Sequence, residues 1–269
     1  MSSPTAPSTS RSLSTRMAAA LADLAPASLF HPMTARLHLR AEPEMRRVIN
    51  SCDPRGRALD IGAWYGPWTY WLSKRMDFVD SFEPNAKVAA ALRAGADENV
   101  TVHELALSDA VGEADLRLLT SGTGSEGTAT IVPGVEGVSS MRVPTARVDD
   151  FEFTDVRFIK IDVEGHEQAV LDGALQTIKE QKPVVFVELE ERMADIERTI
   201  EFFAGIGYEG RFMMGGTWTP TSVLDLAEWQ RAFHREHEPQ SYIGTVVAPR
   251  EYVNDVAFVH PHSTWSPWA

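Results

Sequence analysis

The fold is decided by the stretch ALDIGAWYG at residues 58–66, in which an apolar strand runs into a turn that contains two glycines. A helical segment near Thr69–Arg75 follows the turn. Glycine lets the backbone come close to a ligand, and open α/β sheets bind nucleotide-like ligands in the crevice outside the carboxyl ends of their strands. The stretch therefore predicts a ligand site at the end of the first strand.

The acid in this stretch narrows the class of ligand. A nicotinamide or flavin dinucleotide calls for G-x-G-x-x-G, which brings the pyrophosphate to a helix N-terminus, whereas the spacing here is D-x-G-x-x-x-G. Asp60 would repel a pyrophosphate, but it suits a ligand that carries an amino group or another cation, and S-adenosylmethionine carries both. The alternative is an ordinary strand-to-helix turn with a capping acid.

Short apolar runs alternate with helical stretches on both sides of this turn. The expected strands are Ala58–Ile61, Phe78–Phe82, Val100–Leu107, Phe158–Ile161 and Val184–Leu189, and the expected helices are Thr34–Asn50, Thr69–Arg75, Ala86–Ala94 and Glu167–Gln181. Continuous apolar strands separated by helices are typical of a parallel sheet covered on both faces. We therefore predict an α/β fold with a doubly wound, mostly parallel sheet.

Two regions depart from this alternation. Residues 119–140 are rich in Gly, Ser and Thr, and we expect a long loop or hairpin insertion that borders a site. Late strands at Tyr208–Met214 and Tyr242–Val247, with the helix Leu224–Arg235 between them, predict an antiparallel addition to the sheet edge. The expected division is an N-terminal extension that is disordered or helical (residues 1–33), a folded domain (34–250) and a C-terminal tail that is a wrapped arm or disordered (251–269).

The second strand ends in the sequence SFEPN at residues 81–85. Glu83 lies about 20 residues beyond Gly62, the spacing at which an acid binds both hydroxyls of a ribose. Pro84 stops the strand and presents the carboxylate. Glu83 is thus predicted to be a ribose ligand, and the alternative is a helix-capping acid.

The third strand is followed by the sequence ALSD at residues 106–109. Ala106 and Leu107 suit the face of an adenine, and Ser108 or Asp109 can meet its edge. Taken alone, the segment is equally consistent with a plain strand-end turn.

Acids also gather after the fourth and fifth strands. Asp162 and His166 follow the fourth strand, and Glu188 ends the fifth. Asp162 and Glu188 together are a candidate Mg²⁺ site, because this ion takes one or two carboxylates plus waters. The alternatives are a helix-capping acid cluster for Glu188 and a helix-start residue for His166. The absence of N-P-P-Y and D-P-P-Y disfavours methylation of exocyclic amines.

Composition excludes several classes of partner. The net charge of −13 disfavours a surface that tracks phosphates, so neither nucleic acid nor an anionic membrane is expected as a partner. Cys52 is the single cysteine, which excludes intrachain disulfides and a Cys-based zinc site. One unpaired thiol suits a reducing compartment, and no apolar run is long enough to span a membrane. We expect a cytoplasmic protein.

Four segments carry a resemblance to a known family: ALDIGAWYG at 58–66, SFEPN at 81–85, ALSD at 106–109 and IKIDVEGHEQAVLDGA at 159–174. Together they resemble the FkbM-type S-adenosylmethionine-dependent methyltransferases over about residues 45–250, and RVDDF at 147–151 is similar to that family's TLDDF stretch. The resemblance implies a class I, Rossmann-like fold with a seven-stranded sheet. It also implies O-methylation of a hydroxyl on a small or glycosylated specialised metabolite, such as a sugar or polyketide.

The placement of these residues at strand ends, together with the resemblance, predicts their roles. The expected cofactor-binding residues are Asp60, Gly62, Ala63, Trp64, Gly66, Thr69, Glu83, Ala106, Leu107 and Ser108. The general base is expected to be Asp162 or His166, because an alcohol is a poor nucleophile at neutral pH. The other possibility is that Mg²⁺ on Asp162 and Glu188 lowers the pKa of the hydroxyl.

Trp64 departs from the family pattern, which usually has Asn in D-I-G-A-N-x-G. The indole either reshapes the cofactor pocket, contacts the sulfonium by a cation–π interaction, or marks a lost cofactor site. Two alternatives to an active methyltransferase remain, and Trp64 motivates only the first of them. One is a catalytically degenerate protein that binds S-adenosylmethionine, and the other is a nucleotide-dependent oxidoreductase on the same fold.

Overall fold

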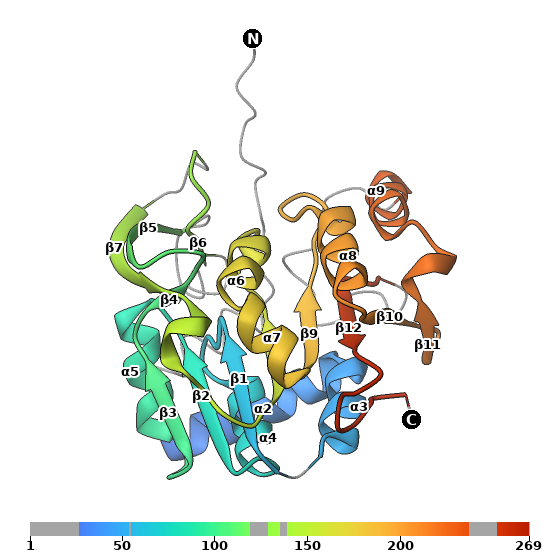
Figure 1. The fold of residues 1–269 in the computed structure, drawn as a ribbon. Helices are drawn as coiled ribbons and strands as arrows, with labels where there is room; N and C mark the ends of the chain where they lie inside the picture. Colours follow the sequence, from blue (N-terminus) through green and yellow to red (C-terminus); the bar gives the residue numbers. More distant parts are fainter. Residues whose placement is uncertain (1–26, 54, 119–128, 135–138, 237–251, 269) are drawn as a thin grey trace.

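The computed structural model describes residues 27–53, 55–118, 129–134, 139–236 and 252–268. Its centre is an eight-stranded sheet in the order β11-β10-β12-β9-β8-β1-β2-β3 (Figure 1). The parallel strands are β1 (Arg57–Ile61), β2 (Phe78–Phe82), β3 (Val100–His103), β8 (Val156–Ile161) and β9 (Val184–Glu188). The predicted doubly wound, mostly parallel sheet is confirmed, and the carboxyl ends of its parallel strands share one edge.

The antiparallel part of the sheet differs from the sequence prediction. It consists of β10 (Glu209–Met214), β11 (Thr217–Pro220) and β12 (Asp255–Val259), with β12 between β9 and β10. The expectation of an arm or disordered tail at residues 251–269 is therefore wrong for 255–259, because Val256–Val259 are buried in the sheet interior. The sheet also has eight strands rather than seven. The strand expected at Tyr242–Val247 lies outside the described residues.

Helices cover both faces of the sheet (Figure 1). One face carries α2 (Ala27–Ala41), α3 (Pro43–Ser51), α4 (Pro67–Ser73) and α5 (Ala86–Gly95), and the other carries α6 (Glu167–Gly173), α7 (Leu175–Gln181), α8 (Ile196–Gly205) and α9 (Leu226–Glu236). Each face has its own apolar cluster, one with Met45, Trp68 and Leu72 and one with Val170, Ile178 and Phe203. The apolar residues of the alternating strands and helices form these two layers, and their burial drives folding.

Two expected helices are each divided in the structure. The segment expected as Thr34–Asn50 is α2 followed by α3, with Glu42 at φ −111° and ψ 89° between them. Pro43 explains this break, because a proline disfavours the helical conformation in the residue before it. The expected helix Glu167–Gln181 is interrupted at Ala174, which has φ −112° and ψ 3°. Residues 27–33 of the N-terminal extension are helical, as part of α2.

A second sheet in the order β4-β7-β5-β6 stands at the carboxyl edge of the main one. Its strands are β4 (Ala106–Leu107), β5 (Gly112–Leu118), β6 (Ala129–Thr130) and β7 (Ser139–Ala146). The strand expected at Val100–Leu107 is thus split, and its last two residues pair with β7. The described part of the expected insertion at 119–140 supplies β6 and the start of β7.

Short 3₁₀ helices occupy Val148–Phe151 and Thr221–Val223. Within the part of the chain that the structure describes, no helix is long and apolar enough to cross a membrane.

Candidate active site

The turn after β1 joins the ends of three strands. The backbone N–H groups of Gly62 and Ala63 both donate to the carbonyl of Phe82, at 3.1 and 3.0 Å. Gly62 has φ +74°, and a Cβ built on it would lie 1.8 Å from the carbonyl oxygen of Asp162. Only glycine allows this approach, which brings the ends of β1, β2 and β8 together.

Asp60 lies under this turn and is completely buried. Its Oδ2 accepts a hydrogen bond of 2.5 Å from Thr69 Oγ1, which is also 2.8 Å from Ser81 Oγ. Its Oδ1 has no hydrogen-bond partner and lies 3.7 Å from the ammonium of Lys160. Burial raises the pKa of Asp60, and the charge of Lys160 opposes that rise. A buried carboxylate oxygen without a donor is suited to a further cationic group.

Lys160 connects β8 to the same turn. Its Nζ donates to the carbonyl of Gly62 at 2.9 Å and lies 3.1 Å from Asp162 Oδ2. Burial lowers the pKa of this lysine, but the carboxylates of Asp162 and Asp60 outweigh burial and raise it overall, so the ammonium stays charged. Lys160 was absent from the residues predicted from sequence. The available signal was a lysine inside an otherwise apolar strand.

Glu83 lies at the end of β2, where its spacing from Gly62 predicts it. Its carboxylate accepts hydrogen bonds from the backbone N–H groups of Trp64 at 3.0 Å and Asn85 at 2.8 Å. Burial raises the pKa of Glu83 to about 7, and these two hydrogen bonds oppose the rise. The carboxylate is therefore held in one orientation beside the β1 turn.

The turn after β4 brings together residues far apart in the chain. Ala106, Leu107 and Ser108 are all buried. Ser108 Oγ donates to Asp109 Oδ1 at 3.1 Å and lies 2.9 Å from His166 Nε2, so the imidazole donates to the hydroxyl. Burial lowers the pKa of His166. Gly173 of α6 packs on the same turn, since a Cβ there would lie 2.0 Å from the Ser108 carbonyl oxygen.

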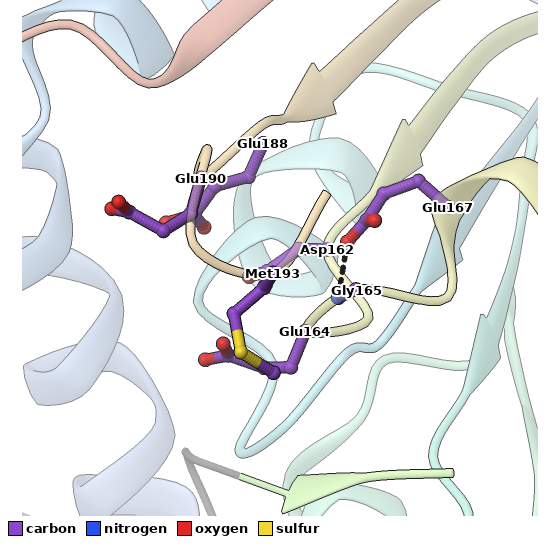
Figure 2. A pocket seen from close by; sticks show the side chains of 7 residues that line it. All are labelled: Asp162, Glu164, Gly165, Glu167, Glu188, Glu190 and Met193. Carbon is purple, nitrogen blue, oxygen red and sulfur yellow. Dashed lines mark hydrogen bonds between the residues drawn. The ribbon is translucent and has the colours of Figure 1, made fainter. Parts of the chain in front are cut away.

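An acidic pocket opens between the ends of β8 and β9. It is lined by Asp162, Glu164, Gly165, Glu167, Glu188, Glu190 and Met193 (Figure 2). Burial, with Asp162 as the next cause, raises the pKa of Glu164 to about 8. Burial also raises the pKa of Glu167 to about 7, although its carboxylate accepts a 2.9 Å hydrogen bond from the Gly165 N–H. The carboxylate of Asp162 raises the pKa of Glu188 well above its usual range.

Residues 60–209 match the family model described as the methyltransferase FkbM domain, which covers more than half of the chain. The chain belongs to the FkbM methyltransferase family. The resemblance read from the sequence is thereby confirmed. The family match supports a methyltransferase and gives no support to an oxidoreductase on this fold.

Solved structures of similar proteins include the FkbM methyltransferase from Methylobacillus flagellatus, with 17% identity and a TM-score of 0.48. The match covers 76% of this chain and 44% of that one, so the FkbM chain described here spans less than half of the Methylobacillus protein. A precorrin-6y C5,15-methyltransferase from Geobacter metallireducens has 11% identity and a TM-score of 0.41, over 81% and 87% of the two chains.

A putative methyltransferase from Streptococcus mutans, solved in complex with SAH, has 9% identity and a TM-score of 0.42, over 81% and 96% of the two chains. A search of curated proteins finds no match.

The expected Mg²⁺ site is not supported in this FkbM chain. Glu188 Oε1 accepts a 2.6 Å hydrogen bond from Asn254 Nδ2. Within residues 27–53, 55–118, 129–134, 139–236 and 252–268, no group of three or more His, Cys, Asp or Glu side chains is arranged to hold a metal ion. Asp162 and Glu188 repel each other, and this repulsion raises the pKa of Glu188.

Trp64 contributes to the site through its backbone. Its N–H donates to Glu83, and its φ is +49°. The indole packs edge-on against Tyr65, with ring centroids 5.0 Å apart, and against His38 of α2, at 5.4 Å. The aromatic ring that departs from the FkbM pattern therefore anchors the N-terminal helix to the turn.

Proposed function

We propose that this FkbM protein is an S-adenosylmethionine-dependent O-methyltransferase that acts on a hydroxyl of a small or glycosylated metabolite, such as a sugar or polyketide. The observation that carries this proposal is the buried Asp60 beside the Gly62 turn, whose Oδ1 lacks a hydrogen-bond partner and faces the Lys160 ammonium at 3.7 Å. A cation is the group that such an oxygen binds best.

The residues at the β1, β2 and β4 ends fit the parts of S-adenosylmethionine. Asp60 would meet the amino group, and Glu83 the two ribose hydroxyls. The buried Ala106 and Leu107 would flank the adenine, with Ser108 at its edge. The contact of Gly62 with the Asp162 carbonyl holds the β1 turn against the end of β8, beside these residues. Asp60 and Glu83 thus supply two buried carboxylates as acceptors for the amino group and the ribose hydroxyls.

The chemistry divides between cofactor and protein. S-adenosylmethionine supplies an already activated methyl group, so this chain mainly has to orient an oxygen and accept a proton. Asp162 lines the acidic pocket, and its side chain is 34% exposed. We propose that Asp162 takes the proton from the acceptor hydroxyl as the oxygen bonds to the methyl carbon, while the bond between that carbon and the sulfonium sulfur would break and S-adenosylhomocysteine would leave. His166 is the weaker candidate base, because its Nε2 is engaged with Ser108.

The pocket bears on the class of acceptor. Five of its seven lining residues carry carboxyl groups, which disfavours a polyanion such as nucleic acid and favours a neutral hydroxyl compound. Cys52 is buried and unpaired, which suits a reducing compartment. We propose the cytoplasm as the site of action.

A transfer assay tests the proposal. The protein is incubated with S-adenosylmethionine that carries a ¹³C-methyl group and a panel of sugars, polyketides and amines, and products are analysed by NMR and mass spectrometry. We expect an O-methyl product that forms equally well in the presence of EDTA. N-methyl products would contradict O-methylation. Cofactor binding without turnover on any acceptor would favour a catalytically degenerate binding protein. That alternative is suggested by Trp64, which stands where the family usually has Asn.

A further inference from the structure

Lys160 is a buried cation that contacts both halves of the site. Its side chain comes from β8 and is almost fully enclosed. The register of the parallel pair places Asp60 opposite Lys160. Its Nζ lies 2.9 Å from the Gly62 carbonyl oxygen, 3.1 Å from Asp162 Oδ2 and 3.7 Å from Asp60 Oδ1. One ammonium thus links the cofactor turn to the proposed base.

We propose that Lys160 is a positioning residue that fixes the carboxylate of Asp162 against the Gly62 turn and sets the charge that a cationic methyl donor meets there. This inference rests on the proposed function.

The backbone of Asp162 is fixed, but its side chain depends on Lys160 for its position. The Asp162 N–H donates to the carbonyl of Ile61 at 3.1 Å, and Gly62 packs on the Asp162 carbonyl, so the backbone of Asp162 is held against the β1 turn. The side chain of Asp162 is 34% exposed, and Lys160 supplies its ion pair. Loss of the ammonium would let this carboxylate rotate. Misplacement of a catalytic group by about 1 Å can cost on the order of 100-fold in rate.

Lys160 also sets the net charge of this part of the site. Asp60 and Asp162 bring two negative charges, and Lys160 compensates for one of them. S-adenosylmethionine has a positive sulfonium, whereas the product S-adenosylhomocysteine has a neutral sulfur. A site without Lys160 would be more negative and would favour the cofactor over the product. Coulomb interactions at this range in a partly buried site reach the size needed for a tenfold preference.

Calorimetric titration with both compounds measures the ratio of their affinities, and turnover kinetics measure kcat and KM. The chain offers a matched control in Lys179, an exposed lysine on α7. In Lys160→Met we expect the ratio of S-adenosylmethionine affinity to S-adenosylhomocysteine affinity to rise by on the order of tenfold, with kcat falling more than KM for the cofactor rises. Lys160→Arg should keep the wild-type ratio while lowering kcat, and Lys179→Met should change neither.

The outcomes distinguish the two proposals. If the wild type binds neither compound, the proposed function fails and this inference fails with it. If the wild type binds both and Lys160→Met leaves the affinity ratio unchanged, the inference on Lys160 alone is overturned. If Lys160→Met does not fold by circular dichroism, Lys160→Gln takes its place against Lys160→Arg, and an equal ratio in that pair overturns the inference.

Discussion

The carboxylates at the ends of β1 and β2 differ in burial and in partners from those at the ends of β8 and β9: Asp60 and Glu83 are buried, whereas Asp162 and Glu188 are half-buried. Glu83 accepts two backbone N–H groups, and Asp60 accepts the hydroxyl of Thr69. In the acidic pocket, the carboxylate of Asp162 is the main cause of the raised pKa of Glu188. The proposed cofactor end is thus stabilised within the protein, whereas the proposed acceptor end retains repulsion that a ligand can relieve.

The two regions also differ in how far apart their residues lie in the sequence. The proposed cofactor end is built largely from residues 60–85, a single strand–turn–helix–strand unit. The acidic pocket needs the loop after β8 and the segment after β9, and Asn254 reaches Glu188 from just before β12. Local sequence therefore specifies the first region, and long-range packing specifies the second.

The largest effect is expected when a side chain is added at Gly62, where the two regions touch. Gly62→Ala should abolish cofactor binding and lower the free energy of unfolding by more than about 3 kcal/mol, because its Cβ would overlap the Asp162 carbonyl. Gly134 is the matched control, since it has φ +82° and nothing within 4 Å of an added Cβ. Gly134→Ala should cost only about 1–2 kcal/mol of backbone strain. Equal losses in urea unfolding would contradict the close contact.

The next largest effect is expected for Asp162→Asn, which should lower turnover far more than it weakens cofactor binding. We expect kcat to fall by about 100-fold or more, the effect of losing a general base, while binding of S-adenosylmethionine weakens less than about tenfold. Single-turnover kinetics and calorimetry measure the two quantities. Asp172→Asn, at an exposed position of α6, is the control. Unchanged turnover in Asp162→Asn would remove Asp162 from the proposed chemistry.

Removal of the Glu164 carboxyl group from the acidic pocket should stabilise the folded protein at high pH and not at low pH. Burial and Asp162 raise the pKa of Glu164 from 4.5 to about 8. Between these values the folded protein binds more protons than the unfolded chain, so the free energy of unfolding falls as pH rises from 4.5 to about 8. Glu164→Gln should raise that free energy by about 1–3 kcal/mol near pH 9 and leave it unchanged near pH 4.

Urea unfolding at the two pH values measures the effect of Glu164→Gln. Glu201→Gln, at an exposed position of α8, should show no gain at either pH. A loss of stability in Glu164→Gln near pH 9 would mean that this carboxylate is favourably paired, and the contrast between the two regions would not hold.

The smallest effect is expected at His166, which links α6 to the Ser108 turn. His166→Asn should raise KM for S-adenosylmethionine by roughly three- to tenfold, the value of one hydrogen bond, and change kcat by less than about twofold. His262→Asn, at an exposed position near the C-terminus, is the control. A fall in kcat of about 100-fold with KM unchanged would instead identify His166 as the base.

The sequence predicted the parts of the fold that depend on short segments. The bounds of β2 and the place of Glu83 follow from an apolar run that a proline ends, and both are found as predicted. The insertion of β12 between β9 and β10 could not be read in this way, because Asp255–Val259 pairs with strands that precede it by dozens of residues.

The same reason accounts for the site residues that sequence reasoning missed. Lys160 has the pattern of a residue inside a buried strand, and only the packing of β1 against β8 reveals its three partners. His166 and Ser108 were both predicted as site residues, but their contact across 58 positions of the chain was not. The pairing of side chains across the two regions is a product of tertiary structure.

Binding of S-adenosylmethionine to the β1 and β2 ends is the central claim, and isothermal titration with wild type, Glu83→Gln and Glu201→Gln tests it most directly. The account predicts micromolar binding in wild type and Glu201→Gln that is lost in Glu83→Gln and that strengthens as pH rises through about 7, where Glu83 ionises. NAD⁺ should not bind. Absence of cofactor binding in the folded wild type, or equal binding in Glu83→Gln, would contradict the account.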